Sequence, residues 1–143
     1  MDERLDYDIQ MAEGTEDILC PRFLLQPLVE NAIVHGIDPL ENGGYLTINA
    51  HMTGAIIEIC IHDNGLGMSS EALHDLEDRL SSGVSAHRDS AKFNGLGMNN
   101  VIQRMKYLYG SSFESRLISD EGHGFTVILL WKGAARNEAS NRR

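Results

Sequence analysis

A short glycine-rich segment that follows an apolar run has the residue types needed to bind an amine-bearing ring. Residues 55–62 are rich in isoleucine and are typical of a strand, and residues 63–68 follow with the sequence DNGLGM. The carboxylate of Asp63 can accept a hydrogen bond from an exocyclic amine such as that of adenine. Gly65 and Gly67 let the backbone turn tightly and approach a ligand. The same residues are common in ordinary turns, so the segment alone leaves open whether it binds a ligand or only forms a turn.

A second segment carries polar side chains at helical spacing. Residues 24–36 read LLQPLVENAIVHG, within a helix that we predict over residues 22–35, with Leu28 and Ala32 on its core face. Asn31 and His35 lie four residues apart and therefore project from one face, with Glu30 beside them. An amide oxygen suits Mg²⁺, which prefers oxygen ligands and keeps several waters. A self-satisfied helix residue and a core or surface histidine are the alternative interpretations of Asn31 and His35.

A third segment, residues 95–101 with the sequence GLGMNNV, opens a helix that we predict over residues 98–109. Glycines before a helix let backbone N–H groups and the positive end of the helix face an anion, so the segment is suited to phosphate. Between the two glycine segments, residues 81–94 are polar and have no periodicity, which is typical of a functional or disordered loop. Arg88 and Lys92 in this loop are candidate phosphate contacts, or simply solvated surface charges.

The remaining elements must position these three segments. Alternating apolar residues predict strands, and apolar residues at helical spacing predict one more helix, which Ser69 can cap. Pro27 falls inside the first helix, where we expect either a bend or a fresh start of the helix. The predicted strands cover residues 4–11, 45–52, 55–62, 112–119 and 125–131, the middle pair as a hairpin, and the additional helix covers residues 70–81.

Composition sets the broad class of the protein. The 143 residues fit a single domain, 1–143, with a core over about residues 4–132 and a polar tail at 133–143 that is expected to fray. The formal charge of −9 argues against a broad nucleic-acid or anionic-membrane surface. There is no run of about 18 apolar residues. Cys20 and Cys60 lack metal-ligand spacing, and we expect structural, reduced thiols, with Cys60 as a small core residue of its strand, and a cytoplasmic setting.

In order and spacing, the three segments resemble the nucleotide-binding domain of sensor histidine kinases, which belongs to the GHKL ATPase group (gyrase, Hsp90-type chaperones, histidine kinases and MutL). The segment LQPLVENAIVHG is similar in sequence to the corresponding segment of LytS/YesM-type kinases. The resemblance covers about residues 6–131. It implies an α+β fold, the Bergerat fold: a two-layer α/β sandwich in which helices cover one face of a mixed, mostly antiparallel sheet. It also identifies residues 81–94 as a nucleotide lid.

The resemblance implies roles for individual residues. Asn31 would hold Mg²⁺ on the phosphates of ATP, Glu30 would assist as a base, and Asp63 would recognise the adenine amine with help from Thr126. Val34 stands where many relatives have lysine, which puts one phosphate contact in doubt. The remaining nucleotide-binding residues implied are His35, Gly65, Gly67, Met68, Gly95, Leu96, Gly97, Met98 and Asn100.

The function implied is ATP–Mg²⁺ binding and delivery of the γ-phosphate to a histidine on an upstream dimerisation domain. No His-Phe-Leu-Phe-Asn-type acceptor motif is present, so the chain resembles an excised, monomeric catalytic domain that does not autophosphorylate alone. Its relatives sit beneath membrane-spanning sensors and signal to a response regulator. One alternative is a GHKL ATPase that hydrolyses ATP with water, although Pro27 occupies the place of its catalytic glutamate. The other is a non-catalytic or serine-directed nucleotide-binding module, which Val34 favours.

Overall fold

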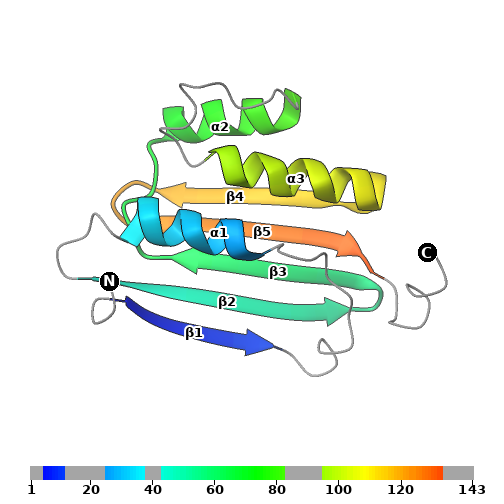
Figure 1. Ribbon diagram of the computed structural model, residues 1–143, viewed down its shortest axis with the longest axis horizontal. Coiled ribbons are helices and arrows are strands. Elements are labelled where there is room, and N and C mark those ends of the chain that lie inside the picture. The colour runs from blue at the N-terminus through cyan, green and yellow to red at the C-terminus, as the bar shows by residue number, and fades with distance from the viewer. Residues whose placement is uncertain (1–4, 12–24, 38–42, 83–94, 134–143) are drawn as a thin grey trace.

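A computed structural model of the chain describes residues 5–11, 25–37, 43–82 and 95–133. In these ranges five strands form one sheet in the order β1–β2–β3–β5–β4. Figure 1 shows α1 and α3 in front of the sheet, with α2 beside α3. The strands are β1 (Leu5–Met11), β2 (Gly44–Thr53), β3 (Ile56–Asp63), β4 (Glu114–Asp120) and β5 (Gly124–Lys132). The helices are α1 (Leu25–Asn31), α2 (Ser70–Ser82) and α3 (Gly95–Tyr109).

The sheet is mixed and mostly antiparallel, as predicted. β1 pairs with β2 in parallel, whereas β2 with β3, β3 with β5, and β5 with β4 are antiparallel pairs. The hairpin predicted for β2 and β3 is confirmed. Together with the helices this is the α+β architecture expected from the sequence. No helix in the described ranges has the length and apolar character needed to cross a membrane.

One face of the sheet carries the core. Side chains alternate along β3 and β5, so that Ile57, Ile59 and Ile61 are buried together with Val127, Leu129 and Trp131 of the neighbouring strand. From the helix layer, Ile102 and Met105 of α3 are fully buried against this face. Cys60, predicted as a core residue, instead faces the other side and is half-buried. Burial and the nearby Glu58 raise its pKa, which keeps the thiol protonated.

The first helix differs from the prediction in one respect. α1 begins at Leu25, so Pro27 lies in its first turn, where a missing N–H costs no hydrogen bond. The departure from α-helical geometry comes later, because Ala32–Ile37 continue as a π-helix. Leu28 and Ala32 are buried in the core, as expected. The described helix thus starts close to Pro27, where a bend or a fresh start was expected, and the wider helical turn follows at Ala32–Ile37, beside β3.

The other two helices pack against each other through polar contacts to one carbonyl. Ser69 caps α2 as predicted, because its Oγ accepts a hydrogen bond from Ala72 N–H at 3.2 Å. Gln103 Nε2 and Lys106 Nζ of α3 each donate to Leu80 O near the end of α2, both at 3.1 Å.

α3 begins at Gly95, three residues earlier than predicted. Its opening glycines therefore lie within the first turn of the helix rather than before it.

Candidate functional site

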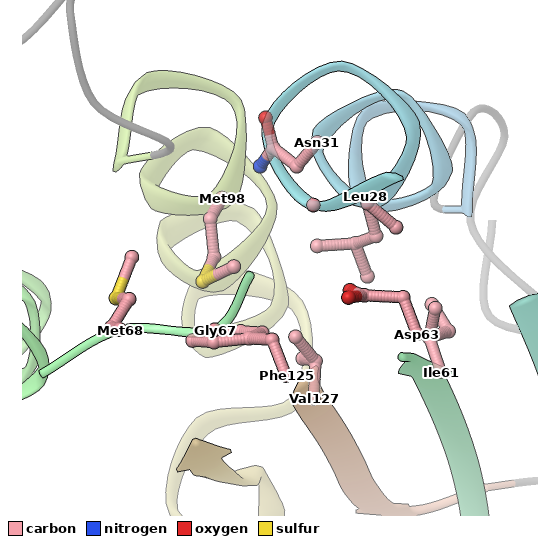
Figure 2. A pocket seen from close by; sticks show the side chains of 11 residues that line it. Leu28, Asn31, Ile61, Asp63, Gly67, Met68, Met98, Phe125 and Val127 are labelled. Carbon is pink, nitrogen blue, oxygen red and sulfur yellow. The ribbon is translucent and has the colours of Figure 1, made fainter. Parts of the chain in front are cut away.

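A pocket lies where the first helix, the start of α3 and the ends of two central strands meet (Figure 2). Its volume is about 400 Å³, including space that is open to solvent. Most of the lining is apolar, and the polar side chains come from Asn31 of α1 and Asp63 of β3. The lining residues are Leu28, Asn31, Ala32, Gly36, Ile61, Asp63, Gly67, Met68, Met98, Phe125 and Val127. Such a mostly apolar hollow with few polar groups is typical of small-molecule sites.

Asp63 is the charged group of this pocket. It is only 3% exposed, and its Oδ1 accepts a hydrogen bond from Gly65 N–H at 2.8 Å. Burial raises the pKa of Asp63 above its ordinary value, an effect that the amides of Gly65 and Phe125 and the nearby His62 partly offset. Figure 2 shows the carboxylate pointing into the pocket beneath Leu28. A buried carboxylate in an apolar wall favours a ligand that donates hydrogen bonds to it.

The segment that follows Asp63 is pressed against the π-helix. A Cβ added at Gly65 would lie 2.2 Å from both the carbonyl carbon and the oxygen of Gly36, closer than any side chain can approach. Leu66 N–H donates to Gly36 O at 3.1 Å, which joins the two backbones. Gly65 is therefore buried beneath the pocket wall and contributes by permitting this contact rather than by lining the pocket.

The same segment is held on its other side by the turn between β4 and β5. Gly67 has a φ of +69°, and a Cβ there would lie 2.5 Å from Asp120 O and 2.7 Å from Gly124 O. Gly122 N–H donates to Leu66 O at 2.6 Å. The backbone of residues 65–67 is thus held between the π-helix and this turn, and Gly67 forms part of the pocket wall.

Residues of the second and third sequence segments meet at the junction of α1 and α3. A Cβ added at Gly97 would lie 3.3 Å from Pro27 Cβ and 3.9 Å from Asn31 Nδ2, so the second glycine of α3 packs directly against α1. Asn31 lines the pocket beside Met98. Glu30, its neighbour, is exposed and accepts a hydrogen bond from Gln26 Nε2 at 3.0 Å. Asn31 and Asp63 therefore belong to one pocket, whereas Glu30 faces away from it.

The structure does not bring Thr126, predicted as part of the adenine site, into the pocket. Along β5 the odd-numbered residues face the helices, so Thr126 points to the opposite face of the sheet. There its Oγ1 lies 2.8 Å from Nδ1 of His62, with which it forms a hydrogen bond. Phe125 pairs with Asp63 across the strands and lines the pocket in its place.

Other predicted residues stand further from the pocket or outside the described ranges. Asn100 is exposed and does not line the pocket, whereas its neighbour Asn99 is buried and accepts a hydrogen bond from Gln103 Nε2 at 3.4 Å. Gly95 and Leu96 lie in the first turn of α3. The side chain of His35, the loop residues Arg88 and Lys92, and most of the predicted lid lie outside the residues described.

Sequence reasoning missed the apolar half of the lining. Leu28 and Ala32 were predicted only as core, and Ile61 and Val127 only as strand residues, although all four line the pocket. Strand alternation could have found Phe125, because it lies an even number of residues from the tryptophan at 131 and so shares its buried face.

The sequence profile of the histidine kinase-, DNA gyrase B- and HSP90-like ATPases matches residues 16–134. The match covers most of the chain, including every residue of the pocket. The chain belongs to this ATPase family. The fold brings together, at the junction of α1, β3 and α3, the three sequence segments whose residues resemble this family.

Two curated relatives and one solved structure illustrate the similarity. Sensor histidine kinase YpdA of Escherichia coli is 36% identical over 77% of this chain, which spans 17% of that protein. Sensor protein LytS of Oceanobacillus iheyensis is 30% identical over 94% of the chain, which spans 22% of it. The chain thus spans about a fifth of the length of these relatives. The structure of full-length ShkA in complex with AMPPNP has a similar fold, with a TM-score of 0.61 and a sequence identity of 15%. The superposition covers 92% of this chain and 26% of the ShkA chain.

Proposed function

We propose that this member of the ATPase family is the ATP–Mg²⁺-binding catalytic domain of a two-component sensor histidine kinase. It would deliver the γ-phosphoryl group of ATP to a ring nitrogen of a histidine on an upstream dimerisation domain, leaving ADP. The observation that carries the proposal is the carboxylate of Asp63, which is 3% exposed at the base of an apolar pocket. The sensor histidine kinases among the relatives and the nucleotide analogue in the ShkA structure support it.

In this proposal the adenine ring enters the apolar part of the pocket. Its exocyclic amine donates to the carboxylate of Asp63, and the ring packs against Met68, Met98 and Phe125. A charged acceptor in a buried site forms a strong hydrogen bond, and it disfavours a base that presents a carbonyl oxygen at the same place. Adenine should therefore be preferred over guanine.

The phosphates and the metal would lie toward the junction of α1 and α3. Asn31 supplies an amide oxygen, a ligand type that suits Mg²⁺, so it would hold the ion, which would supply positive charge to offset that of the phosphates. The first turn of α3, with Gly95, Leu96 and Gly97, presents the N-terminal end of a 15-residue helix, which favours anions. We retain His35 and Asn100 as further nucleotide contacts, and Glu30 as a base that assists the acceptor histidine.

The partners follow from the same proposal. The acceptor histidine belongs to a dimerisation domain outside this chain, so the chain alone would bind ATP as a monomer without phosphorylating itself. The phosphoryl group would then pass to a response regulator. The parent protein would be a sensor at the inner membrane, with this domain in the cytoplasm.

Calorimetric titration of the domain with ATP, with and without Mg²⁺ and with GTP as the control, tests the proposal. We expect adenine-selective binding that Mg²⁺ strengthens. Equal affinity for GTP, or no binding, would contradict the assignment of the pocket. Incubation with γ-labelled ATP and a separately purified histidine-bearing dimerisation domain then separates a kinase from an ATPase. Transfer of label to histidine supports the kinase, whereas release of inorganic phosphate without transfer would contradict it.

Replacement of Asn31 by alanine should remove most of the gain in ATP affinity that Mg²⁺ gives. Affinity measured in EDTA should change little, because the base contacts remain. The measurement is a pair of titrations for each protein, with and without Mg²⁺. Asn49→Ala is the matched control, since Asn49 lies on the face of the sheet opposite the pocket and should leave both affinities unchanged. An unaltered Mg²⁺ effect in Asn31→Ala would assign the metal to another group.

A further inference from the structure

A serine at the end of β4 joins three backbone segments beside the pocket. Ser119 Oγ accepts a hydrogen bond from Met68 N–H at 2.6 Å. The same hydroxyl can donate to Gly124 O at 3.2 Å or to Met68 O at 3.4 Å. The residues that it joins are 51 and 5 positions away along the chain. The short bond to Met68 is therefore a tertiary contact between the pocket segment and the outer strand pair.

The position of this bond matters because Met68 and Gly67 line the pocket and Ser119 does not. Backbone contacts already press Gly67 against Asp120 O and Gly124 O, so the segment touches the turn on that side. The hydrogen bond from Met68 N–H to Ser119 Oγ follows directly and fixes the position of the backbone just after Gly67. If it were lost, the half-buried Met68 N–H would lack this acceptor and the wall across the pocket from Asp63 would be free to shift.

We propose that Ser119 is a positioning residue for the nucleotide pocket: its hydroxyl holds the wall formed by Gly67 and Met68 at the distance that an adenine ring requires. This inference rests on the proposed function, since it assumes that adenine fills the pocket. Ser119 acts through the backbone of Met68 and does not touch the ligand. Because the wall it holds faces the base, its effect on affinity is independent of Mg²⁺.

Calorimetric titration of ATP into the domain and its Ser119→Ala variant tests the inference. We expect the affinity of the variant to fall about three- to tenfold, the range that loss of one hydrogen bond gives. The factor should be the same with and without Mg²⁺, and the number of sites per chain should stay at that of the unmutated domain. Ser119→Thr keeps the hydroxyl and should restore most of the affinity.

Ser115→Ala provides the matched control. Ser115 lies four residues earlier on the same strand, is half-buried on the same face, and has no part in the pocket, so its removal should leave ATP affinity unchanged. An affinity of Ser119→Ala equal to that of the unmutated domain would overturn the inference. So would an equal loss in Ser115→Ala, or a loss that appears only with Mg²⁺. Absence of ATP binding by the unmutated domain would instead overturn the proposed function.

Amide exchange gives a second measurement that does not depend on whether the variant folds. In the unmutated domain the Met68 N–H should exchange at least about tenfold more slowly than in an unstructured peptide, because it is bonded to Ser119. Where Ser119→Ala folds, this protection should fall while that of Leu66 N–H, bonded to Gly36, stays. Exchange of Met68 at the unstructured rate in the unmutated domain would overturn the inference.

Discussion

Replacing Asp63 by asparagine is expected to weaken ATP binding by about 1.5–3 kcal/mol, or roughly ten- to a hundredfold. The amide still accepts the hydrogen bond from Gly65 N–H, so the local turn can persist. What the change removes is the negative charge that faces the adenine amine in a buried site. The selectivity for adenine over guanine should shrink with it, because the asparagine NH₂ group can also donate to a carbonyl oxygen.

The same substitution should leave the ligand-free domain at least as stable at neutral pH. The pKa of Asp63 is raised in the folded chain above its unfolded value of about 3.8, so ionisation costs folding free energy. This cost is absent below the unfolded pKa and grows as pH rises from there through the raised folded pKa. Asparagine cannot ionise, so the advantage of Asp63→Asn in unfolding free energy should appear as pH rises through that window and persist above it.

Titration calorimetry with ATP and GTP, and thermal unfolding at pH 3 and pH 7, measure both effects. Asp75→Asn is the matched control, because Asp75 is exposed on α2 and loses the same charge away from the pocket. A variant at Asp63 that binds ATP as tightly as the unmutated domain would remove this residue from adenine recognition. The difference in stability between Asp63→Asn and the unmutated domain is compared at the two pH values. An advantage of the variant that is smaller at pH 7 than at pH 3 would contradict the stated cost of burying the charge.

Replacing Gly65 by alanine is expected to destabilise the fold by about 2–4 kcal/mol and to weaken ATP binding as well. The added methyl would lie 2.2 Å from backbone atoms of Gly36, which cannot rotate away as a side chain would. The segment and the π-helix must therefore separate, at the cost of overpacking and of the bond from Leu66 N–H to Gly36 O. Because Gly36 lines the pocket, this separation should also change the shape of the base site.

Thermal unfolding of Gly65→Ala should show a midpoint lowered by roughly 5–15 °C for a domain of this size. Gly54→Ala is the control, since a Cβ there would meet no atom within 4 Å. Its positive φ of 62° should cost only about 1 kcal/mol. Equal midpoints for the two variants would mean that the backbone contact at Gly65 has no special weight.

The parts of the site that the sequence predicted are those fixed by local pattern. Asp63 ends an alternating strand and Met98 lies in the first turn of a periodic helix, so the positions of both within their elements place them at the pocket. Burial of Asp63 could not be read from the sequence in the same way. It depends on the close approach of Gly36, which is far from Asp63 along the chain.

Two differences between the sequence predictions and the structure have a common origin, which is the direction in which side chains project along an element. Thr126 was placed by its similarity to a family motif, and a shift of one residue along a strand moves a side chain to the other face of the sheet. The π-helix at Ala32–Ile37 changes the direction in which side chains project after Asn31, and apolar spacing did not reveal it. The contact of Ser119 with the pocket segment could not be predicted, because its hydrogen bond to Met68 joins segments that no local sequence pattern connects.

The pairing of β3 with β5 has a consequence for synthesis of the chain on the ribosome. Ile61 pairs with Val127, so the strand that ends in Asp63 has no partner on this side until β5, the last described strand, has emerged. Until then Ile57, Ile59 and Ile61 lack most of the surface that buries them, and such unpaired strands are prone to aggregate. A nascent domain should therefore acquire affinity for ATP only after residue 132 leaves the exit tunnel, and chains truncated before β5 should depend on chaperones.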